Sequence, residues 1–150
     1  MNVPRIIATL GGVGYAPYAP GTAGSIVALP FAWLIAYGAG RFALMLAAVL
    51  ALAIGAWASE LYTAQTKRPD PSECVVDELA GQWIACAFAP TTLLGFGLAF
   101  LLFRLFDTWK PWPIRAVERL HGGIGVMADD VLAALVAGAI LFGLLSFGLI

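Results

Sequence analysis

The sequence contains few charged residues, few cysteines and a single histidine. Charged residues make up 11% of the 150 residues and hydrophobic residues 61%, whereas soluble domains carry about 25% charged residues. Together with a mean hydropathy of +0.91, this composition favours an integral membrane protein over a very hydrophobic soluble bundle. The Lys and Arg residues are too few and too mixed with acids to predict a nucleic-acid partner.

The scarcity of cysteine excludes two kinds of site. Cys74 and Cys86 form no CxxC pair, so no zinc or redox motif is predicted, and each is expected to be a free thiol. The first 25 residues do not resemble a signal peptide, because Gly11 and Gly12 interrupt the short apolar stretch after Arg5. No repeat or low-complexity linker divides the chain, which predicts one domain over residues 1–150.

Apolar runs and helix-breaking residues predict a multi-helix membrane bundle. In order, we expect a Gly- and Pro-rich loop at 11–25, helices at 26–40 and 42–58 joined by a tight turn at Gly40–Arg41, a loop at 63–74, an apolar run at 79–103 interrupted at Pro90, a polar segment at 104–128, and a last helix from about 129 to 150.

The run at 79–103 has two interpretations, a single membrane span or a helical hairpin that turns at Pro90. In the hairpin, seven basic residues share one side and only Arg41 lies on the other, whereas a single span divides them more evenly. The positive-inside rule favours the asymmetric hairpin, with short cytoplasmic-face loops. The first leg, 79–89, would be only about 16 Å long, which predicts shallow or tilted insertion. The seven residues are Arg5, Lys67, Arg68, Arg104, Lys110, Arg115 and Arg119.

The nine acidic residues fall into two polar patches and predict metal-assisted phosphate chemistry. Acids are costly in so apolar a chain and are therefore expected to be functional. Clustered carboxylates bind divalent cations, and clustered Arg and Lys bind phosphate. One patch contains Asp70, Glu73, Asp77 and Glu78, with Glu60 just before it; the other contains Asp107, Glu118, Asp129 and Asp130.

Two tandem acid pairs, Asp77–Glu78 and Asp129–Asp130, each open an apolar run. Helix capping would explain one acid of each pair but leaves the second without a role. Neighbouring residues point about 100° apart on a helix, so one acid could hold a metal while the other braces a neighbouring base or helix.

The segment from Arg104 to Arg115 is dense in polar and aromatic residues. Asp107 and Lys110 share a helix face if the helix extends that far, and Pro111 and Pro113 would then end it. Trp109 and Trp112 resemble interfacial anchors. His121, followed by Gly122 and Gly123 in a predicted flexible turn, is a candidate phosphate ligand or proton donor.

The segment Pro20–Ser25, with sequence PGTAGS, precedes the first long helix. Free backbone N–H groups at a helix start bind anions, and glycines allow close approach. The alternative is a plain Gly-rich turn in which Thr22 or Ser25 is the N-cap. No GKS or GKT follows, so the segment is not a Walker A loop.

Motifs of several phosphate-transferring enzymes are absent. No Cys has an Arg six positions later, no Asp-x-Asp occurs, and a single His cannot supply the histidines of type-2 lipid phosphatases. The Asp-Gly-x-x-Ala-Arg signature of membrane CDP-alcohol phosphotransferases is missing as well.

Four motifs together resemble the phosphatidylglycerophosphatase A family: APGTAGS at 19–25, VVDELAGQW at 75–83, FRLFDTWKPWPI at 103–114 and HGGIGVMADD at 121–130. The resemblance runs from about residue 10 to 138. It implies a small helical membrane enzyme that removes phosphate from phosphatidylglycerophosphate to give phosphatidylglycerol, with Mg²⁺ as cofactor.

The residue types and the resemblance together give the predicted site. Metal ligands are expected among Asp77, Glu78, Asp107, Asp129 and Asp130; catalytic residues among Asp77, Asp107, Lys110, His121 and Asp130; and contacts to the substrate phosphate from Gly21, Thr22, Gly24, Ser25, Arg104 and Arg115. The active site is expected at the cytoplasmic face of the bacterial inner membrane. The alternatives are a membrane metal-ion transporter and a non-enzymatic adaptor; acids at span ends favour surface chemistry over transport.

Overall fold

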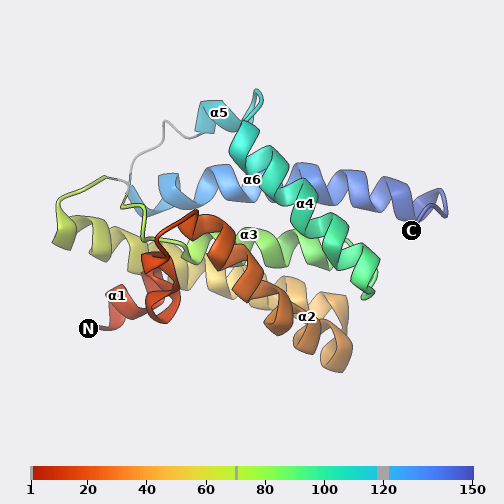
Figure 1. The fold of residues 1–150 in the computed structure, drawn as a ribbon, viewed down its shortest axis with the longest axis horizontal. Coiled ribbons are helices and arrows are strands. Elements are labelled where there is room, and N and C mark those ends of the chain that lie inside the picture. The colour runs from red at the N-terminus through yellow and green to blue at the C-terminus, as the bar shows by residue number, and fades with distance from the viewer. Residues whose placement is uncertain (1, 70, 118–121) are drawn as a thin grey trace.

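The computed structural model describes residues 2–69, 71–117 and 122–150, and within them it contains helices and no strands (Figure 1). The elements are α1 (Val3–Ala8), the 3₁₀ helix η1 (Leu10–Tyr15), α2 (Pro20–Thr66), α3 (Val76–Ala87), α4 (Leu93–Trp109), α5 (Ile114–Val117) and α6 (Gly122–Ser146). The prediction of an all-α bundle is confirmed. Asp70, Glu118, Arg119 and the candidate His121 lie outside the described residues.

Helix α2 folds back on itself at Gly40, where the sequence predicted a turn. Gly40 has φ 85° and ψ 170°, a conformation that residues with a Cβ rarely adopt. Figure 1 shows the two legs, 20–39 and 41–66, running in opposite directions. The first leg begins at Pro20 rather than at 26, because the fixed φ of proline suits the first turn of a helix. The predicted loop was therefore wrong for residues 20–25.

Helices α3 and α4 form the predicted hairpin. Helix α3 ends at Ala87, before Pro90, and α4 begins after Thr92, whose hydroxyl accepts a hydrogen bond from Gly95 N at 3.0 Å. Figure 1 shows α4 returning toward the start of α3. The single-span alternative for residues 79–103 is thus excluded, and the start of α3, with Asp77 and Glu78, lies beside the end of α4, with Asp107.

Helix α6 begins earlier than predicted. Gly122–Gly125, expected as a flexible turn, is helical, because packing of α6 against α3 and α4 overrides the low helix propensity of glycine. Asp129 and Asp130 therefore lie inside the helix, and the N-capping explanation for this pair was wrong.

The packing is that of a membrane bundle, with small residues inside and large apolar residues outside. Ala28, Ala32 and Ala36 recur every fourth residue on α2 and are buried, whereas Phe31 and Leu34 on the same leg are more than half exposed. Small residues let membrane helices approach closely. Helix α2 and the Met127–Ser146 part of α6 are long and apolar enough to cross a membrane.

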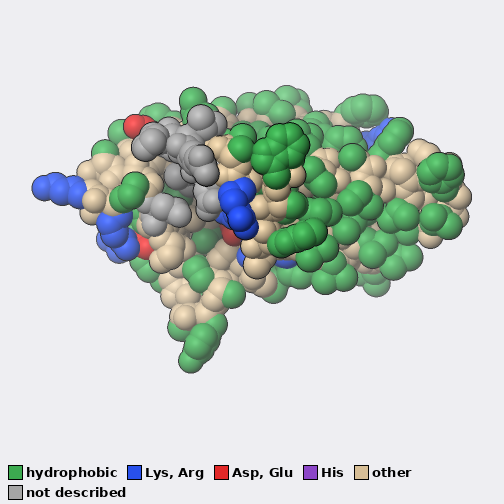
Figure 2. All heavy atoms as spheres, turned by 90° about the horizontal axis from the view of Figure 1, so that it is seen from above, with side chains coloured by type: hydrophobic (Ala, Val, Ile, Leu, Met, Phe, Trp, Pro, Cys, Tyr) green, Lys and Arg blue, Asp and Glu red, His purple; other side chains and the backbone are tan. Residues whose placement is uncertain are grey.

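The polar side chains gather toward one part of the molecule. Figure 2 shows hydrophobic side chains over the right half of the visible face, and most of the visible Lys and Arg side chains toward its left and middle. The start of α3 and the end of α4, which carry acids, therefore lie away from this apolar half of the molecule.

Candidate active site

Three carboxylates from three helices converge at the end of the α3–α4 hairpin. Glu78 lies in the first turn of α3, Asp107 in the last turns of α4, and Asp130 in α6. One oxygen from each lies within 4.8 Å of the others. Asp107 is 7% exposed and Asp130 4% exposed, so the cluster is largely withdrawn from water. These three residues are called the acid cluster below.

Arg104 provides positive charge to the acid cluster. Its Nη1 atom donates to Glu78 Oε2 at 2.5 Å and to Asp107 Oδ2 at 2.7 Å. Asp130 Oδ2 is buried and has no hydrogen-bond partner among the described residues. A buried carboxylate oxygen without a partner is costly, so this atom is available to a cation. Carboxylate oxygens are the ligands that hard divalent cations prefer.

The pKa values of Asp77 and Glu78 are both raised, first by burial and then by neighbouring acids. Burial and then the charge of Glu78 raise the pKa of Asp77 well above its usual value. Burial and then the charge of Asp107 raise the pKa of Glu78, although Arg104 opposes the shift. Asp77 is half-buried, and its Oδ1 accepts a hydrogen bond from the Glu78 N–H at 2.9 Å. Burial and the neighbouring acids thus both disfavour the ionised form of these carboxyls, a cost that a bound cation would offset.

Asp129 and Asp130 contact different partners, because neighbouring residues on a helix point about 100° apart. Asp130 joins the acid cluster, whereas Asp129 Oδ2 accepts a hydrogen bond from Lys110 Nζ at 2.6 Å. Lys110 ends α4 in the left-handed conformation, with φ 46°, and so leaves the helical geometry on which the predicted shared face with Asp107 depended. Through this ion pair it ties the end of α4 to α6.

The start of α2 packs directly against the acid cluster. A Cβ added to Gly21 would lie 2.0 Å from Glu78 Oε1 and 3.4 Å from Arg104 Nη1, so only glycine fits without displacing Glu78. A Cβ added to Gly24 would meet less severe crowding, 3.2 Å from Val75 Cβ and 3.4 Å from Glu78 Cβ. Ser25 is buried, and its hydroxyl bridges Gly21 O and Glu78 Oε2, at 3.1 and 3.2 Å.

The PGTAGS segment is thus a helix N-terminus beside the carboxylates. The N-cap is Ala19, which makes no side-chain capping bond, so the alternative that Thr22 or Ser25 is the N-cap was wrong. Thr22 is half-buried in the first turn.

Two tryptophans and two basic residues line a groove next to this site. The groove has a volume of about 600 Å³ and is lined by Trp109, Lys110, Pro111, Trp112, Arg115 and Ala116. Trp109 and Trp112 are 63% and 84% exposed, and their position at headgroup depth stays a prediction. Arg115 is exposed on α5, and the groove links it to Lys110.

The first acidic patch separates into two parts that sequence reasoning did not distinguish. Glu73 lies with Arg68 and Tyr62, away from the acid cluster, and Tyr62 Oη donates to Glu73 Oε1 at 2.9 Å. Burial acts to raise the pKa of Glu73, but hydrogen bonds from its own backbone, Tyr62 and Arg68 outweigh it and lower the pKa. The available signal was Tyr62 itself, a residue with a hydrogen-bonding hydroxyl shortly before the loop that contains Arg68 and Glu73.

Gln82 is a buried polar residue that the sequence analysis also missed. It lies one turn after Glu78 on α3 and is fully buried; its Nε2 donates to Cys86 Sγ at 3.4 Å, and its Oε1 has no partner among the described residues. Its signal was the four-residue spacing from Glu78, which places both on one helix face. Cys74 and Cys86 are buried thiols, as predicted, and no disulfide joins them.

Comparison with known proteins assigns the chain to a family. A family model described as phosphatidylglycerophosphatase A matches residues 6–145. The chain belongs to the phosphatidylglycerophosphatase A family. The family resemblance predicted from the four motifs is confirmed, and so is the prediction of an enzyme of the phosphoric monoester hydrolase class. The transporter and adaptor alternatives are accordingly set aside.

Three relatives match most of the chain. Phosphatidylglycerophosphatase A of Escherichia coli K12 is 35% identical over 143 residues, covering 94% of this chain and 83% of the relative. The Haemophilus influenzae protein of the same name is 34% identical over 146 residues, covering 96% and 90%. A Bacteroides thetaiotaomicron protein named putative phosphatidylinositol-3-phosphatase is 39% identical over 139 residues, covering 87% and 86%. No solved structure matches the chain.

Proposed function

We propose that this enzyme hydrolyses the terminal phosphate monoester of phosphatidylglycerophosphate, releasing phosphatidylglycerol and inorganic phosphate, in a Mg²⁺-dependent reaction at the cytoplasmic face of the inner membrane. The observation that carries the proposal is the convergence of Glu78, Asp107 and Asp130 with Arg104 beside the N-terminus of α2. Family membership supports the substrate, and the seven-to-one distribution of basic residues supports the cytoplasmic face.

The acid cluster would hold the Mg²⁺, with Asp77 and Asp129 adjacent to it. The fit rests on three carboxylates with oxygens within 4.8 Å and on the unpartnered Asp130 Oδ2. When bound there, the ion would supply positive charge to the phosphoryl oxygens and lower the pKa of water.

The chain's own cations and backbone would hold the phosphate. Arg104 contacts two members of the acid cluster and Lys110 contacts Asp129, and the first turn of α2 offers the N–H groups of Gly21 and Thr22. Arg115, on the neighbouring groove, is positioned to attract the headgroup. Positive groups fixed before the reaction stabilise charge that develops in the transition state.

The deciding experiment measures phosphate release from phosphatidylglycerophosphate by the purified protein in detergent, with Mg²⁺ or with a chelator. We expect turnover only with Mg²⁺, and its loss in Glu78→Gln, Asp107→Asn and Asp130→Asn. The exposed acid Glu60 provides the control Glu60→Gln, which should retain wild-type turnover. Full activity in the chelator, or in all three cluster variants, would refute the metal assignment.

A second candidate substrate is phosphatidylinositol 3-phosphate, favoured by the name of the Bacteroides relative. It shares a phosphate monoester on a lipid headgroup with the first candidate. The ratio of kcat/KM for the two lipids, measured in the same detergent, decides between them.

A further inference from the structure

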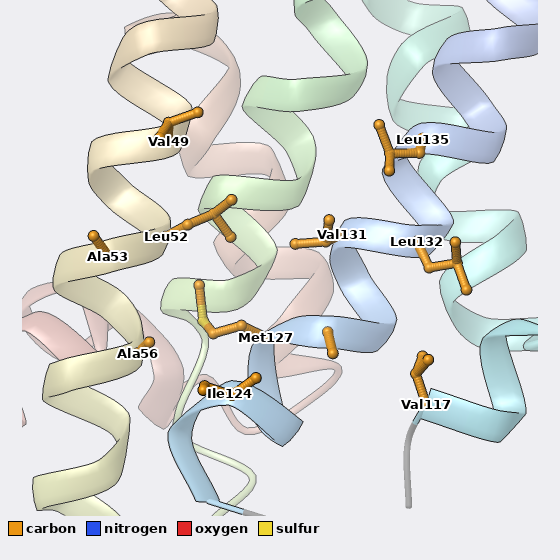
Figure 3. A pocket seen from close by; sticks show the side chains of 11 residues that line it. Val49, Leu52, Ala53, Ala56, Val117, Ile124, Met127, Val131, Leu132 and Leu135 are labelled. Atoms are coloured by element: carbon orange, nitrogen blue, oxygen red, sulfur yellow. The ribbon is translucent and has the colours of Figure 1, made fainter. Parts of the chain in front are cut away.

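A polar pocket lies where α1, η1, the end of α2 and the loop after it meet. Its volume is about 410 Å³, within the range of roughly 300–1,000 Å³ that small-molecule sites occupy. It contrasts with the groove between the second leg of α2 and α6, in which every lining side chain is apolar (Figure 3). A ligand in the polar pocket would be recognised by hydrogen bonds and charge. The lining residues are Asn2, Arg5, Tyr15, Tyr62, Gln65, Thr66, Arg68 and Glu73.

A chain of hydrogen bonds joins five of these residues and uses the hydroxyl protons of both tyrosines. Arg5 Nε donates to Tyr15 Oη at 2.8 Å. Tyr62 Oη donates to Glu73 Oε1 at 2.9 Å, and the two tyrosine oxygens are 3.3 Å apart. Because Tyr62 has already used its proton, Tyr15 donates to Tyr62. Arg68 forms an ion pair with Glu73 and so balances the charge of that carboxylate.

Arg5 keeps unused donors and an unbalanced charge. A guanidinium carries five N–H donors, and Arg5 uses only the one on Nε: its two Nη groups have no hydrogen-bond partner among the described residues. The amide nitrogen of Gln65 likewise has none in that part of the chain. With two arginines and one glutamate, the pocket has a surplus of one positive charge and of N–H donors.

The positive groups of the pocket face solvent, whereas its acid is withdrawn. Arg5 is exposed, and the side chain of Arg68 is 53% exposed against 12% for Glu73. An approaching anion would therefore meet the guanidinium groups first. A terminal phosphate group offers three acceptor oxygens that do not lie in one plane with its ester bond, so it can accept from donors on several segments at once. Arginine also pairs with phosphate through two parallel hydrogen bonds.

The surroundings of the pocket are those of a segment at a lipid surface. Val3 and Ile6 flank Arg5 on α1 and are 60% and 44% exposed. Lys67, next to Arg68, is exposed as well. Apolar and basic side chains that are exposed side by side are typical of contact with anionic lipids. A phosphate on a lipid headgroup could therefore reach the pocket, as could free phosphate.

We propose that this pocket is a second, non-catalytic phosphate site, in which Arg5 and Arg68 bind a terminal phosphate group, carried by a lipid headgroup or present as inorganic phosphate. A phosphate held by both arginines would tie α1 to the loop that precedes α3. The inference does not depend on the proposed function, because the pocket shares no residue with the acid cluster or the tryptophan-lined groove.

The test locates phosphate binding by hydrogen exchange of the purified protein in detergent, followed by mass spectrometry. The probes are inorganic phosphate, phosphatidic acid, and diacylglycerol with the same acyl chains but no phosphate. A chelator is present throughout, so that the proposed Mg²⁺ site does not compete. The variants are Arg5→Gln and Arg68→Gln. Lys67→Gln is the matched control, because Lys67 is an exposed basic residue beside Arg68 that does not line the pocket.

We expect inorganic phosphate or phosphatidic acid to slow exchange in residues 2–15 and 62–69, and diacylglycerol to have no effect. Half-maximal protection should need about tenfold or more probe in either arginine variant, as for loss of a hydrogen bond between charged groups, and the same amount in Lys67→Gln. Protection by phosphatidic acid alone would identify a lipid headgroup as the ligand, and protection by inorganic phosphate would show that the phosphate group suffices.

Three results would overturn the phosphate site. They are protection by neither phosphate probe, equal protection by diacylglycerol, and equal weakening in Lys67→Gln and the arginine variants. Protection confined to residues 76–82 and 104–110 would place the phosphate at the acid cluster and would refute the second site. Melting temperatures check that each variant is folded; if Arg5→Gln is destabilised, Arg68→Gln, which leaves the Arg5–Tyr15 bond in place, decides the outcome. No arm of the test requires turnover, so failure of the proposed function would leave its result intact.

Discussion

At the scale of single residues, Lys110 has the most distinctive position. Its ammonium donates a hydrogen bond to Asp129 Oδ2 at 2.6 Å, at the edge of the acid cluster. There it would also interact with the charge of a bound substrate phosphate. Two roles follow from this geometry: neutralising Asp129, or stabilising the phosphoryl group. The two roles differ in how activity responds when both charges are removed.

We expect Lys110→Ala to lower kcat by about 10²–10³ with little change in KM, as for loss of one fixed transition-state donor. The double variant Lys110→Ala/Asp129→Asn should stay as slow as the single variant. Steady-state kinetics on the lipid in detergent measures both. Recovery of kcat in the double variant would show that Lys110 only neutralises Asp129. Trp112→Ala, which removes an exposed anchor, should instead raise the apparent KM.

Glu73 gives a residue-scale prediction about stability and pH. Its lowered pKa means that the folded state favours the carboxylate, so its contribution to stability is present at neutral pH. That contribution is lost as pH falls below the ordinary glutamate value of 4.5. The melting temperature of the wild type should therefore fall more steeply on acidification than that of Glu73→Gln. Parallel melting curves for the two proteins from neutral pH down to about pH 3 would contradict this.

At the scale of elements, the contact between the start of α2 and the start of α3 sets the position of Glu78. Gly21 allows this contact because a Cβ there would overlap the Glu78 carboxylate. That carboxylate is the end of a flexible side chain, so it can move aside at little cost to folding. The contact therefore serves the geometry of the site more than the stability of the bundle.

Gly21→Ala should consequently lower kcat/KM by about 10²-fold, the typical cost of a displacement of about 1 Å at a reacting centre. Its melting temperature should change little. Gly38→Ala is the matched control on the same leg, since a Cβ at Gly38 meets nothing within 4 Å; it should keep full activity and gain up to about 1 kcal/mol in stability. A large loss of stability without loss of activity in Gly21→Ala would show that the contact serves the stability of the bundle instead.

At the scale of the whole molecule, the two hairpins determine which loops share a side of the membrane. The turn at Gly40–Arg41 lies at the far end of α2 from its two ends, and the Glu78–Arg104 ion pair joins the start of α3 to the end of α4. The loops near residues 65 and 115 should therefore lie on one side and Arg41 on the other.

Cysteine labelling tests this arrangement in a background in which Cys74 and Cys86 are replaced. Gln65→Cys, Ala116→Cys and Arg41→Cys each place a thiol at an exposed position. In inverted vesicles, an impermeant reagent should label the first two, whereas in intact cells it should reach only the third. Labelling of Gln65→Cys and Ala116→Cys from opposite sides would be incompatible with a shared active site.

Much of this organisation was predictable because it follows from local chemistry. Pro90 interrupts an apolar run, Gly40 breaks a long helix, and the basic residues collect at one end, so both hairpins could be read from the chain. The starts of α2 and α6 could not be read, because tertiary packing makes helices of glycine-rich segments that locally resemble turns. The separation of Glu73 from Glu78 was equally hidden, since it depends on where Tyr62 and Arg68 lie in space.

The sequence by itself determined the class of the protein, its helical hairpins, its family and the residue types of the site, because composition, helix breakers and motifs are local properties. Only the tertiary structure decided which acids meet. Glu78, Asp107 and Asp130 converge from three helices, whereas Asp129 turns to Lys110, because neighbouring helical residues point about 100° apart and the packing of α3, α4 and α6 selects which direction faces the centre.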